Sequence, residues 1–204
     1  MSAKRCFPPV VDAETRVLIL GSLPGEVSLA QGQYYANKQN RFWILVGDVI
    51  EENLHDMEYL ERLRTLLKHR IGLWDVVAEA HRSGSLDSNI RDHASNDLAA
   101  LVDTLPDLVA IAFNGGTAAK IGERGLGERI KQYRILRLPS SSPAHAAVPY
   151  SAKLAVWRNI RDCLFGLSLA DQQCFAQVLQ APPRPAPALK RAVARRRKLL
   201  RTDE

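Results

Sequence analysis

The segment Val17–Gly25, with the sequence VLILGSLPG, decides the fold of this chain. A short apolar run that stops at glycine and proline predicts a buried β-strand that ends in a rigid turn. Gly21 and Gly25 leave the backbone bare, so that a ligand can approach it closely, and Pro24 fixes the course of the loop. Two tyrosines and an asparagine follow before the next apolar helix. Together these residues are suited to form the floor and wall of a pocket for a flat polar ring.

Apolar runs of strand length alternate with amphipathic segments along the rest of the chain. We expect strands at residues 17–20, 107–113 and 133–138, and a short extended segment after Gly72 within residues 71–77. Helices are expected at residues 42–50, 57–68, 94–104 and 150–165, with another helix beginning at residue 117. This alternation predicts an α/β fold with a mostly parallel sheet. Because the carboxyl ends of parallel strands meet at one edge of a sheet, the loops after three of these strands should converge on one cleft.

Length and composition limit the domain organisation. A chain of 204 residues with 46% hydrophobic residues can bury one good-sized core. We therefore expect one domain at residues 1–180, followed at residues 181–204 by a proline-rich linker and a basic C-terminal tail. No signal peptide and no apolar stretch of membrane-spanning length is visible. These features favour a cytoplasmic protein without a membrane partner, and we expect a monomer.

The positive charge is concentrated at the C-terminus. The formal net charge is +6, and residues 182–204 carry eight Lys and Arg residues against two acidic residues. The remaining residues contain twenty basic and twenty acidic side chains, so that the expected domain is formally neutral. Charge therefore predicts nucleic-acid binding only for the tail, and DNA binding by the domain must depend on local geometry.

Three cysteines, Cys6, Cys163 and Cys174, show no paired spacing. Free thiols in a reducing compartment explain them better than disulfides or a metal site. They are also too few for an iron–sulfur cluster, which needs four cysteine ligands. We expect neither a metal nor another cofactor.

A second motif lies far downstream, at Leu138–Ala146, with the sequence LPSSSPAHA. Together with Gly21–Gly25, it resembles motifs 1 and 2 of the uracil-DNA glycosylase superfamily. Two further segments, Asn40–Trp43 (NRFW) and Gly84–Asp87 (GSLD), make the chain most similar to the hypoxanthine-DNA glycosylase branch, family 6. The resemblance covers about residues 10–165.

This resemblance implies a three-layer α/β/α fold with a central, mostly parallel four-stranded sheet. It also implies a DNA repair enzyme that hydrolyses the N-glycosidic bond of deaminated bases, chiefly hypoxanthine, with uracil as a further candidate. Such an enzyme flips the base out of the duplex and leaves an abasic site after water attack. Neither motif contains a lysine that could form a Schiff base, so we expect a monofunctional glycosylase without a lyase step.

The resemblance implies that Asn40 is the catalytic amide. Motif 1 of the superfamily commonly carries an Asp or Asn that handles the water, but Ser22 and Leu23 stand at that place here. A serine hydroxyl is a poor base, and Ser22 can at best hydrogen-bond. An amide does not take up a proton usefully either, so Asn40 should position the water. The alternative is that Asn40 only caps the helix that begins near Phe42.

Asn114 is the candidate for base recognition. Hypoxanthine and uracil share a lactam edge, with an N–H donor beside a carbonyl acceptor, and an amide can pair with both groups. Adenine presents the reverse order of donor and acceptor. The alternative is an ordinary turn asparagine before Gly115 and Gly116.

Other residues should line the cleft and contact DNA. Tyr35 or Phe42 could stack on the flipped base, which is worth about 1–3 kcal/mol. The remaining candidates are Gly21, Leu23, Pro24 and Gly25 for the base, and Ser140, Ser141, Ser142, Pro143 and Ala144 for the DNA backbone and the vacated base stack. A polar cluster of Asp75, Arg82, Asp87 and Asn89 is either a lining loop of this pocket or a solvated turn.

Two other functions fit the same sequence. One is a mismatch-specific uracil/thymine-DNA glycosylase, since Asn40–Trp43 resembles that branch too. The other is a non-catalytic nucleic-acid-binding module that lost its activity with the motif 1 amide. Cleavage of oligonucleotides with different target bases separates the three.

Overall fold

The computed structural model describes residues 3–165 and residue 177. The helices and strands named below belong to one compact unit, Met1–Gly166. The tail expected at residues 181–204 and the domain boundary expected at residue 180 lie outside the described residues.

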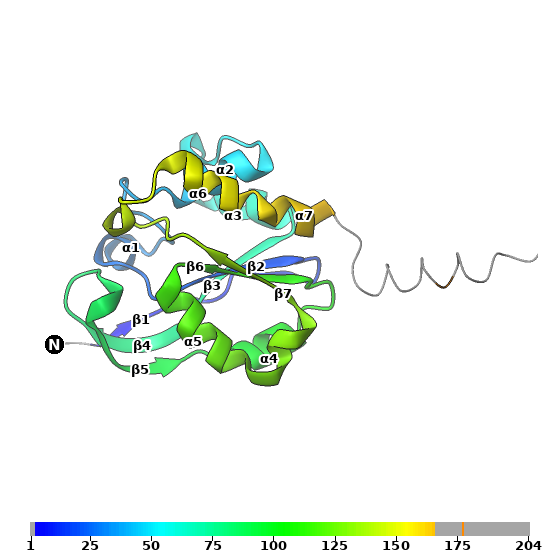
Figure 1. Ribbon diagram of the computed structural model, residues 1–204. Coiled ribbons are helices and arrows are strands. Elements are labelled where there is room, and N and C mark those ends of the chain that lie inside the picture. Colours follow the sequence, from blue (N-terminus) through cyan, green and yellow to red (C-terminus); the bar gives the residue numbers. More distant parts are fainter. Residues whose placement is uncertain (1–2, 166–176, 178–204) are drawn as a thin grey trace, which may run out of the picture. The chain divides into compact units, whose positions relative to one another are not determined.

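A four-stranded parallel sheet forms the centre of this unit (Figure 1). Its order is β3-β2-β6-β7, built from β3 (Ile71–Asp75), β2 (Val17–Gly21), β6 (Ala110–Asn114) and β7 (Arg134–Leu138). In the register, Gly21 at the end of β2 lies beside Asp75 of β3, and Asn114 at the end of β6 lies beside Leu138 of β7. The predicted parallel α/β fold is confirmed, and the ends of the four strands lie at one edge of the sheet.

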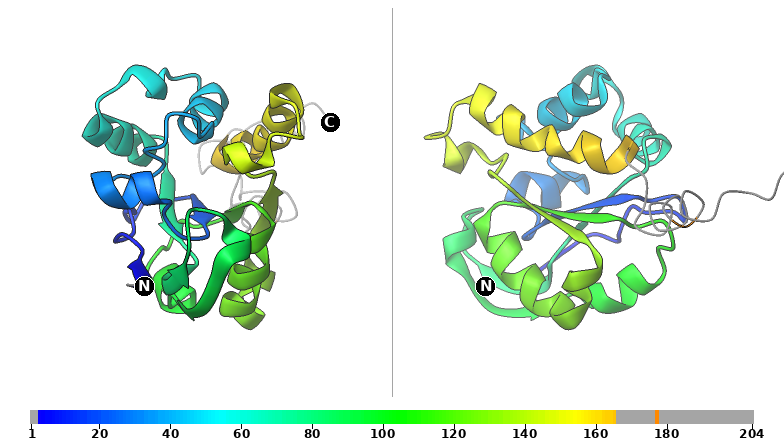
Figure 2. Two further views of the ribbon diagram at one scale, coloured as in Figure 1. Left: turned by 90° about the vertical axis from the view of Figure 1, so that its left-hand side faces the viewer. Right: turned by 45° about the vertical axis from the view of Figure 1, so that its right-hand side comes forward.

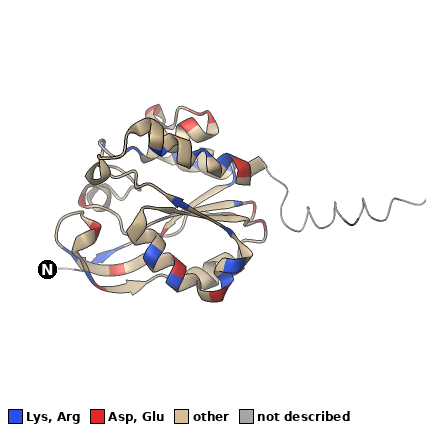
Figure 3. Ribbon diagram, viewed as in Figure 1, with Lys and Arg blue, Asp and Glu red and all other residues tan. Residues whose placement is uncertain are grey.

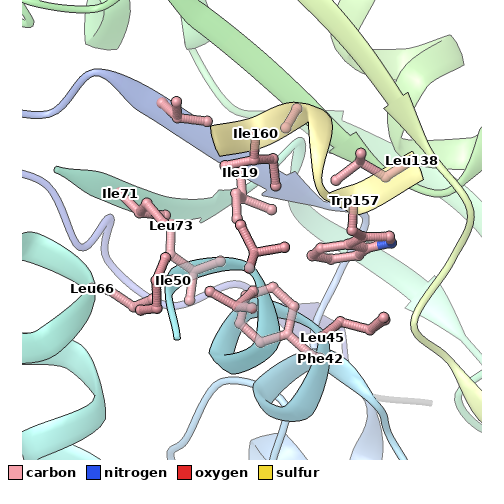
Figure 4. Packing of buried hydrophobic residues seen from close by; sticks show 14 of the residues in the cluster. Ile19, Phe42, Leu45, Ile50, Leu66, Ile71, Leu73, Leu138, Trp157 and Ile160 are labelled. Carbon is pink, nitrogen blue, oxygen red and sulfur yellow. The ribbon is translucent and has the colours of Figure 1, made fainter. Parts of the chain in front are cut away.

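Helices cover both faces of the sheet, which gives three layers (Figures 1 and 2). One face carries α2 (Phe42–Ile50), α3 (Tyr59–Lys68), α6 (Tyr150–Trp157) and α7 (Asn159–Phe165), and the other carries α4 (Leu98–Asp103) and α5 (Gly116–Leu126). Because side chains alternate along a strand, Val17 and Ile19 join one core, whereas Leu18 and Leu20 join the other. Figure 4 shows the first core, in which side chains of α2, α6 and α7 meet those of β2 and β3.

The structure adds a second, antiparallel sheet that the sequence pattern does not indicate. It has the order β1-β4-β5, built from β1 (Lys4–Arg5), β4 (Val77–Arg82) and β5 (Ile90–Ser95). Most of β5 is exposed, so it lacks the alternating apolar residues that mark a strand in a sequence. The turn of the β4–β5 hairpin contains a short 3-10 helix, η2 (Asp87–Asn89).

Two predicted helices have different bounds in the structure. The helix expected at residues 94–104 begins only at Leu98, because residues 94 and 95 belong to β5 and Asp97 caps the helix by accepting from the N–H of Ala100 at 2.9 Å. The helix expected at residues 150–165 is divided into α6 and α7. At the break, Nδ2 of Asn159 donates to the carbonyl of Val156 at 2.9 Å.

Short elements complete the unit. They are α1 (Glu26–Gln31) and the 3-10 helices η1 (Leu54–Asp56), η3 (Gly127–Gln132) and η4 (Pro143–His145). Among the residues that the structure describes, no helix has the length and apolar character needed to cross a membrane.

Candidate active site

A pocket of about 660 Å³ opens where the four parallel strands end. Its lining includes Gly21, Asp75 and Asn114 from the ends of β2, β3 and β6, and Ser140 from the loop after β7. The turn of the β4–β5 hairpin forms another side of the pocket. The structure therefore contains the cleft that the parallel topology predicts.

Almost all the predicted site residues line this pocket. They are Gly21, Ser22, Leu23, Pro24, Gly25, Tyr35, Asn40, Asn114, Ser140, Ser141, Ser142, Pro143 and Ala144. A second hollow of about 600 Å³, lined mainly by residues of α2 and η1, contains none of them. The exception among the predicted residues is Phe42, which does not line the pocket.

A buried arginine outside the pocket lining holds the loop after β2. Arg82 on β4 donates from Nη1 to the carbonyl of Leu23 at 3.0 Å and from Nη2 to the carbonyl of Pro24. The other end of the loop is held by the hairpin turn, because the N–H of Glu26 donates to Oγ of Ser85 at 3.0 Å. The β4–β5 hairpin thus fixes the loop that carries motif 1.

Two carboxyl groups lie beside this loop. Oγ of Ser22 donates to Oδ1 of Asp87 at 2.7 Å, and Nη1 of Arg82 lies 3.8 Å from the same oxygen. Asp75 is 3% exposed, and its Oδ2 has no hydrogen-bond partner among the described residues. Burial raises the pKa of Asp75 to about 7; the charge of Asp87 adds to this shift and Arg82 opposes it. Burial also raises the pKa of Asp87, while the Ser22 hydrogen bond and Arg82 lower it.

Gly21 is required where β2 passes these groups. A Cβ at this position would lie 2.5 Å from Oδ1 of Asp75 and 2.8 Å from the hydroxyl of Tyr35. Real Cβ atoms do not approach other atoms so closely. The glycine therefore lets a carboxyl group and a phenol come together at the bare backbone of motif 1.

An aromatic stack forms another wall of the pocket. The rings of Tyr35 and Phe42 are stacked, with centroids 3.7 Å apart and an interplanar angle of 9°. Phe42 is 0% exposed, lies outside the pocket lining and packs against the face of Tyr35. The prediction that Phe42 itself stacks on a base is therefore wrong. Tyr35 has a φ of 53°, which is rare for a bulky residue and is a form of strain often found at functional sites.

Asn40 lies in the pocket lining just before α2. Its Oδ1 accepts a hydrogen bond from the N–H of Phe42 at 3.0 Å, so the side chain does cap the start of the helix. Oδ1 keeps a second lone pair, and Nδ2 has no hydrogen-bond partner in the part of the chain that the structure describes. The capping role and the water-positioning role are therefore compatible, and the latter stays a prediction.

The amide of Asn114 is used within the protein. Its Oδ1 accepts from the N–H of Ser141 at 2.9 Å. Its Nδ2 donates to Oγ of Ser141 at 2.9 Å and to the hydroxyl of Tyr35 at 3.1 Å. These bonds join β6 to the motif 2 loop and to the aromatic wall. Oδ1 keeps a second lone pair for a base N–H, whereas a bond from Nδ2 to a base requires the exchange of one of its two bonds, and the recognition role of Asn114 stays a prediction.

The motif 2 loop is anchored from several sides. Nζ of Lys153, a buried residue of α6, donates to the carbonyl of Ser140 at 2.7 Å, and the N–H of Arg41 donates to the carbonyl of Ser141 at 3.0 Å. Burial lowers the pKa of Lys153. Ser141 is only 1% exposed, so Ser140 and Ser142 are the more accessible serines of this motif.

The rim of the pocket faces solvent. Pro143 and Ala144 on η4 are exposed, as is Leu86 on the hairpin turn, and Lys120 of α5 adds a positive charge. On α5, Lys120 and Arg124 flank Glu123, and Figure 3 shows basic and acidic residues interspersed over the described part of the chain, in agreement with the neutral charge of the expected domain. No group of three or more His, Cys, Asp or Glu side chains suited to a metal ion is present among the described residues.

The sequence indicated no individual role for Asp75 or Asp87. The hairpin turn is a lining loop of the pocket, one of the two alternatives for this polar cluster. One signal was available for Asp75, because it ends an apolar strand in the same way as Asn114 does. No comparable signal marked Asp87, whose position depends on the unpredicted hairpin.

Comparison with known proteins identifies the family. The model of the uracil DNA glycosylase superfamily matches residues 8–161, which contain every element of the central sheet. This chain belongs to the uracil DNA glycosylase superfamily. A second family model, Antitoxin TacA 1-like, matches residues 160–198, and most of that range lies outside the described residues.

Several relatives of this superfamily member are known. A protein of Methanosarcina acetivorans named hypoxanthine DNA glycosylase is 48% identical over 144 residues, which are 70% of this chain and 88% of the relative. A protein of the same name from Methanosarcina barkeri is 43% identical over 142 residues, with the same shares of the two chains. The solution NMR structure of a candidate uracil DNA glycosylase from Methanosarcina acetivorans matches with a TM-score of 0.67. It is 44% identical, and the match covers 78% of this chain and 99% of that structure.

Proposed function

We propose that this protein is a monofunctional DNA repair glycosylase that removes chiefly hypoxanthine from DNA, with uracil as a further candidate substrate. The observation that carries the proposal is the convergence of Asn40, Tyr35 and the motif 2 loop on one pocket at the ends of the parallel strands. The two Methanosarcina relatives named hypoxanthine DNA glycosylase support the choice of base.

Different residues of the pocket serve base flipping, base stacking and the positioning of the water. The rim at Pro143 and Ala144 is placed to occupy the space that a flipped nucleotide leaves in the duplex. The flipped base lies against the ring of Tyr35, which Phe42 holds in position. Asn40 holds a water through the free lone pair of Oδ1 and directs it to the sugar carbon that bears the base.

The chemical step is a hydrolysis. The bond between C1′ of the sugar and the ring nitrogen of the base breaks, its electron pair leaves with the base, and the water oxygen bonds to C1′. The proton of the water ends on the base or on solvent, and DNA with an abasic site remains. Lys153 is buried under the motif 2 loop, where its Nζ donates to the carbonyl of Ser140, and it lies outside the pocket lining.

Single-turnover cleavage of duplex oligonucleotides tests this function. The substrates carry hypoxanthine, uracil opposite G or A, or thymine opposite G, and strand breakage is measured with and without alkali. We expect cleavage of hypoxanthine that becomes visible only after alkali treatment. Preferential cleavage of mismatched uracil or thymine would support the mismatch glycosylase instead, and binding without cleavage of any base would support a non-catalytic module.

We also propose that the protein acts on DNA as a cytoplasmic monomer. Cys6 and Cys163 are free thiols, which suits a reducing compartment. Light scattering of the full chain at assay concentration should give the mass of a single copy, and a stable dimer would contradict the monomer.

A further inference from the structure

Leu86 is an exposed apolar side chain at the rim of the pocket. The large hydrophobic side chains that are exposed among the described residues are Val27, Leu60, Leu86, Val156 and Phe165. Of these, Val27 and Leu86 line the pocket. Leu86 is 52% exposed and lies in the turn of the β4–β5 hairpin, directly before η2. A single exposed leucine is ordinary on a protein surface, but Leu86 also stands at the mouth of a substrate pocket and meets whatever enters it.

The turn that carries Leu86 is held in place on both sides of this residue. Before it, the carbonyl of Gly84 accepts from Nζ of Lys4 at 2.8 Å, and Oγ of Ser85 accepts from the first N–H of α1 at 3.0 Å. After it, Oδ1 of Asp87 accepts from the serine of the motif 1 loop at 2.7 Å. Leu86 is therefore presented on a fixed support, so that its contact with a ligand orders little further chain.

The acidic residues beside Leu86 are both compensated by a cation. Glu26 at the start of α1 forms an ion pair with Nζ of Lys4 at 2.8 Å. Oδ1 of Asp87 lies 3.8 Å from Nη1 of the buried Arg82. An opposite charge so close reduces the repulsion that these carboxylates exert on a phosphate group. This rim can therefore approach a polyanion such as DNA.

Leu86 and the motif 2 loop lie at the two ends of the strand edge. The hairpin with Leu86 follows β3, and η4 with Pro143 and Ala144 comes after β7. These two strands are the edges of the parallel sheet. A nucleotide that enters the pocket passes between the two rims and leaves its neighbours in the duplex without a stacking partner. The gap left by a bicyclic purine is larger than a proline ring and a methyl group can fill.

We propose that Leu86 inserts into the base stack beside the flipped nucleotide and packs on the face of a base that flipping has exposed. This inference rests on the proposed function, because it requires a nucleotide in the pocket. Leucine is one of the apolar side chains that proteins insert between base steps. The side chain loses its contact with water only when the nucleotide is flipped, so it stabilises the flipped state and not the intact duplex. Leu86 takes no part in the bond-breaking step.

Cleavage of deoxyinosine in duplex and in single-stranded DNA tests the proposal. Leu86→Ala should reduce the single-turnover rate at saturating protein roughly 10-fold on the duplex, as for the lost burial of part of one leucine side chain. It should leave the rate on the single strand of the same sequence unchanged, because no duplex has to be held open there. Leu86→Met keeps a long apolar side chain and should keep the duplex rate.

Leu60→Ala is the matched control. Leu60 of α3 is 63% exposed and lies outside the pocket lining, so its substitution should change neither rate. Thermal unfolding of Leu60→Ala and Leu86→Ala should match that of the parent, since both side chains are exposed. Equal duplex rates for the parent and Leu86→Ala would overturn the proposal. So would an equal loss on the duplex and the single strand, which would place the contact of Leu86 on the base inside the pocket.

A binding measurement separates this inference from the proposed function, because it needs no cleavage. The probe is a duplex with one tetrahydrofuran abasic site, in which the gap already exists, and the intact duplex of the same sequence is the reference. In fluorescence anisotropy titrations, the preference of the parent for the abasic duplex should fall roughly 10-fold in Leu86→Ala and persist in Leu60→Ala. A parent that does not cleave deoxyinosine would contradict the proposed function, whereas an unchanged preference in Leu86→Ala would contradict the insertion of Leu86.

Discussion

The two sides of the pocket differ in how their polar groups are satisfied. On the side of β6 and the motif 2 loop, the amide of Asn114, the backbone of Ser141 and the amine of Lys153 all bond to other protein groups. On the side of β3 and the β4–β5 hairpin, Oδ2 of Asp75 and Nε of Arg82 are buried without a hydrogen-bond partner among the described residues.

This difference separates scaffold from contact surface. Groups that are fully bonded within the protein rigidify a site, and removing one of them leaves its partners unsatisfied. Groups that are buried without a partner weaken the fold, and binding of a ligand can compensate for them. We therefore expect substitutions of Asn114, and of Arg82 with its two bonds to the motif 1 loop, to reduce stability, whereas substitution of Asp75 should cost little stability or increase it.

The side chain of Asn40 caps α2 with one lone pair of Oδ1 and keeps the other free for a water. Its substitution should have the largest effect on cleavage. Asn40→Ala should reduce single-turnover cleavage roughly 10²-fold, because the water loses its position. The lost cap should cost only about 0.5–2 kcal/mol of unfolding free energy. DNA binding should be nearly unchanged in a fluorescence anisotropy titration. Ser22→Ala is the control, because its hydroxyl is bonded to Asp87 and should matter less. A fully active Asn40→Ala would return attention to Ser22 and the motif 2 serines.

Asn114→Ala tests the scaffold side. The substitution removes the hydrogen bonds of Asn114 to Ser141 and Tyr35, which leaves buried polar groups without a partner. It should therefore reduce the free energy of unfolding by about 2–4 kcal/mol. Chemical denaturation measures this loss. Asn159→Ala is the matched control, since the exposed side chain of Asn159 makes a bond to Val156 outside the pocket. Equal losses for the two variants would remove the structural role of Asn114.

Asp75→Asn should make the protein more stable at high pH. The pKa of Asp75 rises from 3.8 to about 7 on folding, so its contribution to stability is complete below pH 3.8 and is lost as the pH rises through about 7. Because Asn cannot ionise, the variant does not lose this contribution. Its free energy of unfolding should exceed that of the parent at pH 8 by up to about 4 kcal/mol, with a smaller difference near pH 4. Thermal unfolding across this pH range measures the effect.

Asp103 is the matched control for the sign of this dependence. Its hydrogen bond with Arg129 lowers its pKa, so its contribution is present above the unfolded pKa and is lost as the pH falls. Asp103→Asn should therefore lower stability most at neutral and high pH. If the free energy of unfolding of the parent exceeded that of Asp75→Asn by an amount that grows with pH, the assignment of Asp75 as a buried, neutral group would be contradicted.

Removal of residues 182–204 should have the smallest effect on chemistry. The segment carries eight basic residues, whereas the expected domain is formally neutral. Without it, the dependence of DNA affinity on salt should flatten by roughly one unit of slope for each lost phosphate contact. The saturated cleavage rate should stay the same. An unchanged salt slope would show that the tail does not bind DNA.

The sequence predicted the scaffold better than the contact surface. Val17–Gly21 and Ala110–Asn114 are continuous apolar runs with clear ends, so their place in a parallel sheet, and the meeting of the loops after them, followed from local patterns. In the β4–β5 hairpin, β5 is mostly polar and exposed, and the pairing of the two strands depends on tertiary contacts that no local pattern records. Through this hairpin Asp87 reaches the pocket and Arg82 reaches the motif 1 loop, and no local pattern shows that Phe42 stacks on Tyr35.

The most direct measurement is a crystal structure of Asn40→Ala bound to a duplex that contains deoxyinosine, since this variant should bind DNA without cleaving it. We expect the flipped base to lie on the ring of Tyr35 in the pocket at the ends of the parallel strands, with C1′ of its sugar facing residue 40. The bonds from Asn114 to Ser141 should remain as they are here. A base that lies outside this pocket, or a C1′ atom far from residue 40, would contradict the account.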